Sequence, residues 1–177
     1  MLRVAVCAAA AAAVACAGEA RVAGDSLQLL DGAWTATSDA AGAVPVPAVV
    51  PGDLISDLAR AGVIPDPFFN LTWRDEAGRW DLAAWTFTRS FATPSWAAAG
   101  ASTLLVFDSV KMAADIVLNG APLGAATSQH LRYSYDVSAL LAPAGGSNTL
   151  SVAFPATVSD TRNDDGRYQG CSGGWDW

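Results

Sequence analysis

Few residues of this 177-residue sequence belong to the types that carry acid–base, nucleophilic or metal chemistry. The sequence has one histidine, His130, and no neighbouring residue is suggested as its partner, so we favour a loop or surface role for it over a general base. The glutamates are Glu19, beside an apolar N-terminal run, and Glu76, in a polar loop. The aspartates are more numerous, but their positions are typical of turns and helix caps. We therefore expect no metal site and no cofactor in this chain.

The composition excludes some classes of binding partner. The formal net charge is −7 and the isoelectric point is near 4.4, which argues against a nucleic acid or an anionic membrane surface. Seven tryptophans are many for a chain of this size. Their large flat faces suit both a β-sandwich core and stacking on sugar rings. We expect most of them to lie in the core.

The N-terminus has the pattern of a secretory signal peptide. Arg3 supplies a positive charge, and an apolar run from Val4 to Ala15 follows it, which is too short for an ordinary transmembrane helix. The small residues at 15–17 form an A-x-A-like cleavage site, and a second possible cut follows Ala20. An Ala-rich start without a signal, or lipid attachment at Cys16, are the alternatives. We predict a signal peptide over residues 1–17 and a short linker over residues 18–26.

The roles expected for the cysteines and for one asparagine depend on whether residues 1–17 are a signal peptide. Cys7 and Cys16 would be removed with the leader, so the processed chain would hold only Cys171, which has no internal partner for a disulfide. Residues 70–72 read Asn-Leu-Thr, a glycosylation sequon that a glycosylating secretory pathway could use at Asn70.

The first half of the processed chain combines short strands with one helix. Leu27–Leu30 and Ala33–Thr37 are predicted to form either a strand pair or one bent strand. The three prolines at 45, 47 and 51 predict an extended, irregular passage. Asp53 stands where a helix N-cap would, and Gly62 where that helix would stop. The segment Pro65–Pro67 is predicted to be a rigid surface loop.

The second half is richer in strand signals. Ala84–Phe91 alternates apolar and polar residues with a period of two, which is typical of a strand with one buried face. Asn119-Gly120 is a favoured two-residue hairpin turn. Further strands are predicted at Leu104–Phe107, Asp115–Leu118, from Leu123, at Tyr133–Val137 and at Leu150–Phe154. About eight short strands and one short helix predict an all-β jelly-roll β-sandwich over residues 27–155, followed by a polar, then Gly- and Trp-rich tail over residues 156–177.

The order of motifs resembles the N-terminal domain of glycoside hydrolase family 2, most closely its β-mannosidase branch. Four stretches carry the resemblance: Leu30–Trp34, the long run VPGDLISDLARAGVIPDPF at 50–68, the hairpin and strand within Asp115–Val137, and the terminal Gly174-Trp175-Asp176-Trp177. The run at 50–68 and the terminal motif are the most characteristic. Together the stretches cover about residues 27 to 177. The sequence departs from the usual pattern at 111–112, 128–130 and 171–173.

The resemblance implies a galactose-binding-like jelly roll whose parent enzyme hydrolyses terminal β-mannosides. Retaining hydrolysis needs two carboxyl groups about 5 Å apart, and the resemblance places both on a catalytic barrel beyond residue 177. Neither Glu19 nor Glu76 matches a catalytic position of the family, so we expect the chain to be inactive alone. In relatives the Trp-Asp of the terminal motif lies against the terminal sugar. Carried over, Asp176 would accept hydrogen bonds from sugar hydroxyls and Trp175 would shape the pocket wall.

Three interpretations remain open at this point. In the first, the chain is a fragment, a truncated gene model or the isolated first domain of a secreted β-mannosidase-like enzyme. In the second it is a stand-alone carbohydrate-binding module, and in the third a structural domain that docks on a barrel. The first implies two kinds of partner: a terminal mannoside, and the C-terminal sandwich and barrel domains of the same protein. It also implies secretion or a lysosome-like compartment.

Overall fold

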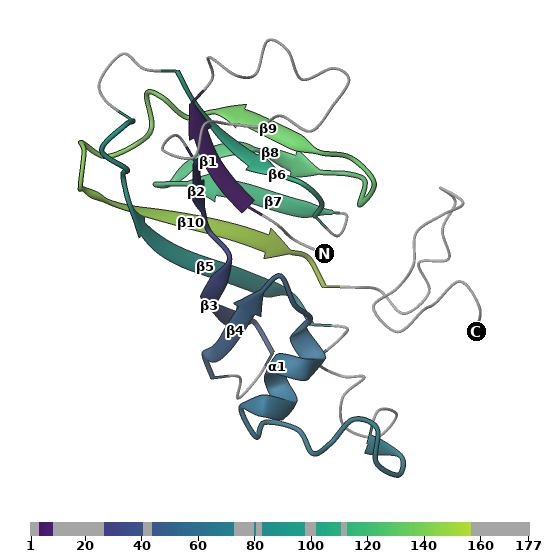
Figure 1. Ribbon diagram of the computed structural model, residues 1–177. Helices are drawn as coiled ribbons and strands as arrows, with labels where there is room; N and C mark the ends of the chain where they lie inside the picture. The colour runs from purple at the N-terminus through teal and green to yellow at the C-terminus, as the bar shows by residue number, and fades with distance from the viewer. Residues whose placement is uncertain are drawn as a thin grey trace.

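The computed structural model describes residues 4–8, 27–40, 44–72, 80, 83–97, 102–110 and 113–156. These residues form two antiparallel sheets and one helix (Figure 1). The predicted all-β sandwich with a single short helix is therefore confirmed. In this described part, no helix has the length and hydropathy needed to cross a membrane.

The two sheets contain ten strands among the described residues, somewhat more than the sequence predicts. The four-stranded sheet has the order β2-β1-β6-β9, and the six-stranded sheet has the order β4-β3-β5-β10-β7-β8. Their bounds are β1 Val4–Ala8, β2 Leu27–Leu29, β3 Gly32–Ser38, β4 Val46–Val50, β5 Trp85–Ala92, β6 Thr103–Phe107, β7 Ala114–Leu118, β8 Ala121–Ala126, β9 Tyr133–Asp136 and β10 Ser147–Phe154.

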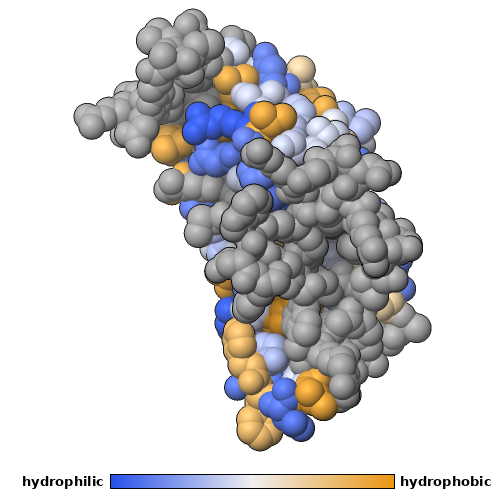
Figure 2. Space-filling model, turned by 90° about the vertical axis from the view of Figure 1, so that its right-hand side faces the viewer, coloured by the Kyte–Doolittle hydropathy of each residue, from blue (hydrophilic) through white to orange (hydrophobic). Residues whose placement is uncertain are grey.

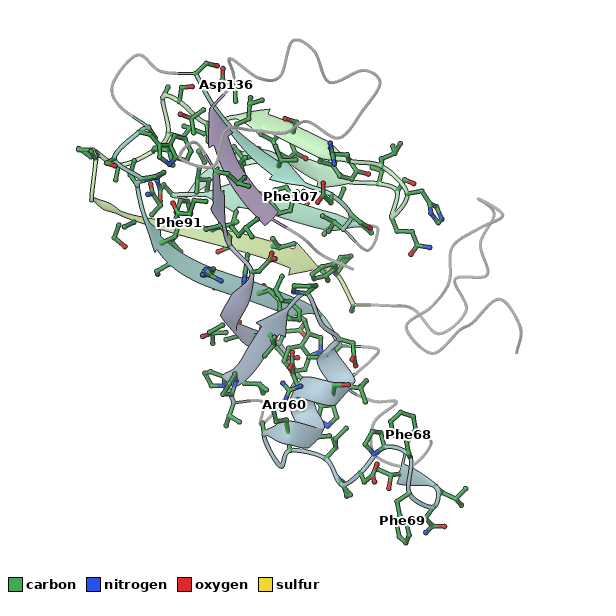
Figure 3. All side chains as sticks on the ribbon, viewed as in Figure 1. Arg60, Phe68, Phe69, Phe91, Phe107 and Asp136 are labelled. Carbon is green, nitrogen blue, oxygen red and sulfur yellow. The ribbon has the colours of Figure 1, made fainter. Side chains whose placement is uncertain are left out.

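Strands β5 and β10 form the centre of the larger sheet. They pair along their whole length, from Ser147 opposite Ala92 to Phe154 opposite Trp85. The inward residues of β10 alternate as predicted, and Leu150 and Val152 are completely buried. The smaller sheet contributes Phe107 to the same core, which Figure 3 shows on a different sheet from Phe91. Burial of these apolar side chains is the main force that holds the sheets together.

The first strand region crosses from one sheet to the other. β2 lies in the smaller sheet and β3 in the larger one, so the region forms neither a strand pair nor one continuous bent strand. The crossing uses Gly32, whose φ of 106° favours glycine. Arg89 of β5 holds the bend, because its Nη1 donates hydrogen bonds of 2.7 Å to the carbonyls of both Leu30 and Asp31.

The proline-rich segment is more regular than the sequence predicts. It is extended, but residues 46–50 form strand β4, which pairs with β3 and places Pro47 opposite Thr35. The expectation of an irregular passage is therefore wrong. β4 is the edge of its sheet, where a residue without an N–H is tolerated. Val46, Ala48 and Val50 face the core in alternation.

Helix α1 (Leu54–Arg60) begins and ends as predicted. The Asp53 carboxylate accepts a hydrogen bond of 2.9 Å from the backbone N–H of Ser56, and Gly62 follows the helix with a φ of 71°. The helix lies against β4, since the buried Asp57 accepts from the N–H of Val49 at 3.2 Å. Together with the following loop it forms a lobe below the two sheets in Figure 1.

Strand β1 comes from the residues that the sequence assigns to a signal peptide. Its backbone pairs with β2 on one side and with β6 on the other, so it lies inside the smaller sheet. Cleavage after residue 17 would remove β1 and leave the facing edges of β2 and β6 unpaired. The signal peptide and the domain bounds stay predictions.

Candidate functional site

The predicted sugar contacts, Asp176 and Trp175, lie outside the described residues, as do Glu19, Glu76 and Cys171. The structure does describe the edge of the sandwich from which the C-terminal tail departs. β10 ends at Phe154, and Pro155 then follows, which has no N–H for a further ladder bond. The strand ends beside Phe154 are therefore the described residues that lie next to the start of the tail.

Five strand ends meet at this edge of the six-stranded sheet. Phe154 lies opposite Trp85 of β5, and Trp85 lies opposite Ser38 of β3. On the other side of β10, Ala153 lies opposite Asp115 of β7, and Ala114 beside it pairs with Ala126 of β8. We call this row the exit edge. It fixes where residue 156 stands relative to the loops that precede β5 and β7 and follow β3 and β8.

The loop at 127–132, between β8 and β9, is described over its whole length. The Tyr133 hydroxyl donates to the Ser128 carbonyl at 2.9 Å and accepts from the Ser128 N–H at 2.7 Å. The Ser109 hydroxyl donates to the Gln129 carbonyl at 2.6 Å, and an exposed ion pair of 2.8 Å joins Arg132 to Asp108. The loops after β6 and after β8 are thus tied together beside the exit edge.

His130 lies on this loop with an exposed side chain, as the sequence predicts. Its Nε2 is 3.4 Å from the Gln129 Nε2, and its backbone N–H donates to the Ser128 hydroxyl at 3.3 Å. No carboxylate is recorded against the imidazole among the described residues, so the arrangement gives it no partner that would make it a general base.

Several aspartates of the described residues accept hydrogen bonds from the backbone: Asp53, Asp66 and Asp136 do so at a cap or turn as predicted, whereas Asp39 and Asp57 join segments that the sequence pattern does not connect. Each accepts from a backbone N–H group: Asp39 from Ala84, Asp53 from Ser56, Asp57 from Val49, Asp66 from Phe68 and Asp136 from Ser138. Within the ranges that the structure covers, no group of three or more His, Cys, Asp or Glu side chains could hold a metal ion. The arrangement supports turns and caps rather than proton transfer.

Two groups at the smaller sheet have shifted pKa values. Hydrogen bonds from the Ser138 hydroxyl and then the Ser138 N–H hold the pKa of the Asp136 carboxyl below its ordinary value. Burial, and to a smaller extent the neighbouring Tyr133, raises the pKa of Tyr135 above its ordinary value. Asp136 ends β9 at the side away from the 127–132 loop (Figure 3), and the Tyr135 ring packs edge-on against Phe107. Both shifts therefore arise from fold-stabilising contacts.

The tryptophans of the described sheets serve the core. Trp34 and Trp85 are each 4% exposed, and Trp80 is 7% exposed. The indole N–H of Trp34 donates to the Leu30 carbonyl, and that of Trp85 to the Trp80 carbonyl, both at 2.8 Å. The prediction that most tryptophans are core residues is confirmed for these three, which leaves their faces unavailable to sugars.

Asn70, the predicted glycosylation site, lies far from the exit edge. It is exposed in the loop that follows α1 and comes directly after Phe69, which Figure 3 shows at the tip of the lower lobe. Of the predicted site residues Asn70, Trp175 and Asp176, the structure describes Asn70 alone, which lies in the loop after α1.

Comparison with known proteins identifies relatives over most of the chain. The beta-mannosidase of Rattus norvegicus is 31% identical over 144 residues, which cover 81% of this chain and 16% of the relative. Beta-mannosidase A of Emericella nidulans is 33% identical over 139 residues, covering 76% of this chain and 14% of the relative. The chain therefore spans only about a seventh of the length of these relatives.

Solved structures agree with the fold. The beta-D-mannosidase from Dictyoglomus thermophilum superposes with a TM-score of 0.63 at 26% identity, covering 71% of this chain and 15% of that chain. The beta-glucuronidase of Bifidobacterium dentium superposes with a TM-score of 0.51 at 31% identity, covering 71% of this chain and 19% of that chain. Residues 34–177 match the family described as glycosyl hydrolase 2 galactose-binding domain-like. On its sequence and its fold alike, the chain belongs to this family of galactose-binding-like domains of glycosyl hydrolase 2.

Proposed function

We propose that this chain is the non-catalytic N-terminal domain of a secreted β-mannosidase-like glycoside hydrolase, and that it supplies part of the sugar pocket. The observation that carries the proposal is the family match, which runs from Trp34 through the terminal Gly-Trp-Asp-Trp. The two β-mannosidases compared align with this chain over only 14–16% of their own length. A domain of this kind contributes side chains to a site whose catalytic carboxylates lie on other domains.

Asp176 and Trp175 are the residues that we assign to the sugar. An ionised carboxylate has two oxygens and can accept from two hydroxyls at once, which suits adjacent hydroxyls of a hexose. An indole covers the apolar C–H face of the same ring. The preferred substrate is a terminal β-mannoside.

Secretion is part of the same proposal. Residues 1–17 have the charge, apolar run and cleavage site of a signal peptide, although Val4–Ala8 also pair as β1 in the unprocessed chain. N-terminal sequencing of the protein isolated from its native source distinguishes the two roles. We expect the mature chain to begin at residue 18 or 21. A mature chain that still begins with residue 1 would show that these residues stay in the protein as part of the sheet. It would contradict the prediction of a signal peptide.

Sequencing the transcript across codon 177 tests the domain assignment. We expect the reading frame to continue into a sandwich domain and a barrel that carries two catalytic glutamates. A stop codon directly after Trp177 would contradict the proposal.

Sugar binding is tested separately on the chain itself. Mannose and manno-oligosaccharides are titrated onto the wild type, Asp176→Ala and the matched tail variant Asp160→Ala. If the chain were a stand-alone binding module, saturable binding would be seen and only Asp176→Ala would weaken it. We expect no saturable binding at millimolar sugar, because the other walls of the pocket belong to the remaining domains.

A further inference from the structure

The loop after α1 presents an unusual apolar tip. Phe68 is 93% exposed, Phe69 is 71% exposed and Leu71 is 47% exposed, although all three lie within four consecutive residues. Figure 3 shows Phe68 and Phe69 at the outermost end of the lower lobe, and Figure 2 shows apolar colouring at that end of the surface. Contiguous exposed apolar side chains mark a surface that something covers.

The tip is a folded loop. The Asp66 carboxylate accepts from the Phe68 N–H at 2.9 Å, and the Asp66 carbonyl accepts from the Phe69 N–H at 3.1 Å. Pro65 and Pro67 restrict the backbone on either side of Asp66. Two further bonds end at the Phe69 carbonyl, from the Thr72 N–H at 3.3 Å and the Thr72 hydroxyl at 2.8 Å. The loop therefore holds its two phenylalanines outward instead of burying them.

Asn70 lies at the corner of the turn that these bonds close. Its φ is 56°, a left-handed conformation that asparagine tolerates better than most residues, and its side chain is exposed. Leu71 and Thr72 complete the acceptor sequence, in which the middle residue is not proline. The acceptor amide thus follows directly on the exposed aromatic pair, and both are accessible from solvent.

We propose that Asn70 carries an N-linked glycan whose first sugars cover the rings of Phe68 and Phe69. The C–H face of a pyranose ring is apolar and packs on an aromatic face, which removes both surfaces from water. A single such contact is weak between free molecules, but the covalent bond at Asn70 gives the sugar a high effective concentration beside the rings. The glycan would thus replace an exposed apolar surface at the tip with a hydrated, polar one. This inference rests on entry into the secretory pathway, which belongs to the proposed function.

The acceptor site is tested with the full chain fused behind a heterologous secretion leader and expressed in yeast or mammalian cells. The heterologous leader makes the result independent of residues 1–17 and of sugar binding at Asp176. The variant Asp165→Thr creates a second sequon at Asn163 and reports that the chain has met the glycosylation machinery. Modification is read from intact mass and from the gel shift on treatment with peptide N-glycosidase.

In the Asp165→Thr background we expect two glycans, and one after Asn70→Gln or Thr72→Ala. A chain that is modified at Asn163 while Asn70 stays bare overturns the proposal. That outcome would leave another protein surface as the cover of the aromatic tip.

The covering of the rings is tested by fluorescence of a hydrophobic dye on the secreted proteins. We expect Asn70→Gln to raise dye binding at least twofold in the wild-type background. The same change should have no effect when Phe68→Ala and Phe69→Ala are already present, and its full effect when Leu131→Ala is present, since Leu131 is an exposed apolar residue elsewhere. An equal rise in all three backgrounds would show that the glycan does not lie on the aromatic pair.

Discussion

Asp57 has the most deeply buried carboxylate among the described residues, with 1% of the residue exposed. One oxygen accepts from the Val49 N–H of β4, and the other pairs with Arg60 on the same helix. The side chain therefore joins α1 to the edge of the six-stranded sheet. The sequence gives no sign of this contact, because it does not show how the connection at 51–53 folds the helix back onto the strand before it.

Replacing this side chain should loosen the lobe. We expect Asp57→Ala to lower the free energy of unfolding by about 1–3 kcal/mol, because the Val49 N–H loses a charged acceptor. Urea denaturation followed by tryptophan fluorescence measures the change. Asp108→Ala is the control: its ion pair with Arg132 is exposed, so it should cost below about 1 kcal/mol. Equal losses in both variants would contradict the role of Asp57.

Asp136 provides a prediction of pH dependence. Its pKa is lowered in the folded state by the two hydrogen bonds from Ser138, so the carboxylate form is the one that stabilises the turn. A group with a lowered folded pKa contributes stability above its ordinary pKa and loses it as the pH falls through the folded value. We expect Ser138→Ala to raise the pKa of Asp136 toward the ordinary value, as measured by NMR titration of the carboxyl carbon. An unchanged titration in Ser138→Ala would refute the assigned cause.

At the scale of elements, Asn148 joins segments that are distant in sequence. It is completely buried on β10, its Oδ1 accepts from Asn119 and from the Ala142 N–H, and its Nδ2 donates to the Thr93 hydroxyl, each at 2.8 Å. It thereby links the β7–β8 turn, the loop before β10 and the end of β5. A buried polar side chain with several partners fixes the register of the strands that it joins.

We expect Asn148→Leu to destabilise the domain by about 2 kcal/mol or more, since it removes three hydrogen bonds of a completely buried side chain, each worth about 0.5–1.5 kcal/mol. Thr149→Leu is the matched control, because the neighbouring side chain is exposed on the same strand. The thermal midpoint of each variant measures the effect. A midpoint for Asn148→Leu equal to that of Thr149→Leu would show that the network does not hold the strands.

The elements that the sequence predicts correctly are those decided by nearby residues. Asp53 caps α1 through Ser56, three residues away, and the Asn119-Gly120 turn has positive φ at both residues. The failure at Pro47 has a tertiary cause: only the order of strands shows that β4 is an edge. The sheet crossing at Leu30 likewise depends on Arg89, 59 residues further along the chain.

At the scale of the whole molecule, the described residues form one sandwich with two separate regions that bear on function. Strand β10 ends at the exit edge of the larger sheet, and α1 with the following loop, which contains Asn70, forms the lobe below the sheets in Figure 1. The resemblance alone predicts Asp176 and Trp175. No local pattern could predict how the loops at 108–110 and 127–132 are joined, since contacts such as Ser109 with Gln129 arise only when the strands are assembled.

The most direct test of the proposed function is the hydrolysis of p-nitrophenyl β-mannoside by the protein made from the complete transcript. Loss of hydrogen bonds to a charged group costs about 1.5–3 kcal/mol, so we expect Asp176→Ala to lower kcat/KM by roughly 10- to 100-fold. Asp160→Ala should leave kcat/KM unchanged, and the 177-residue chain alone should show no turnover. Wild-type kcat/KM in Asp176→Ala, or hydrolysis by the chain alone, would contradict the account.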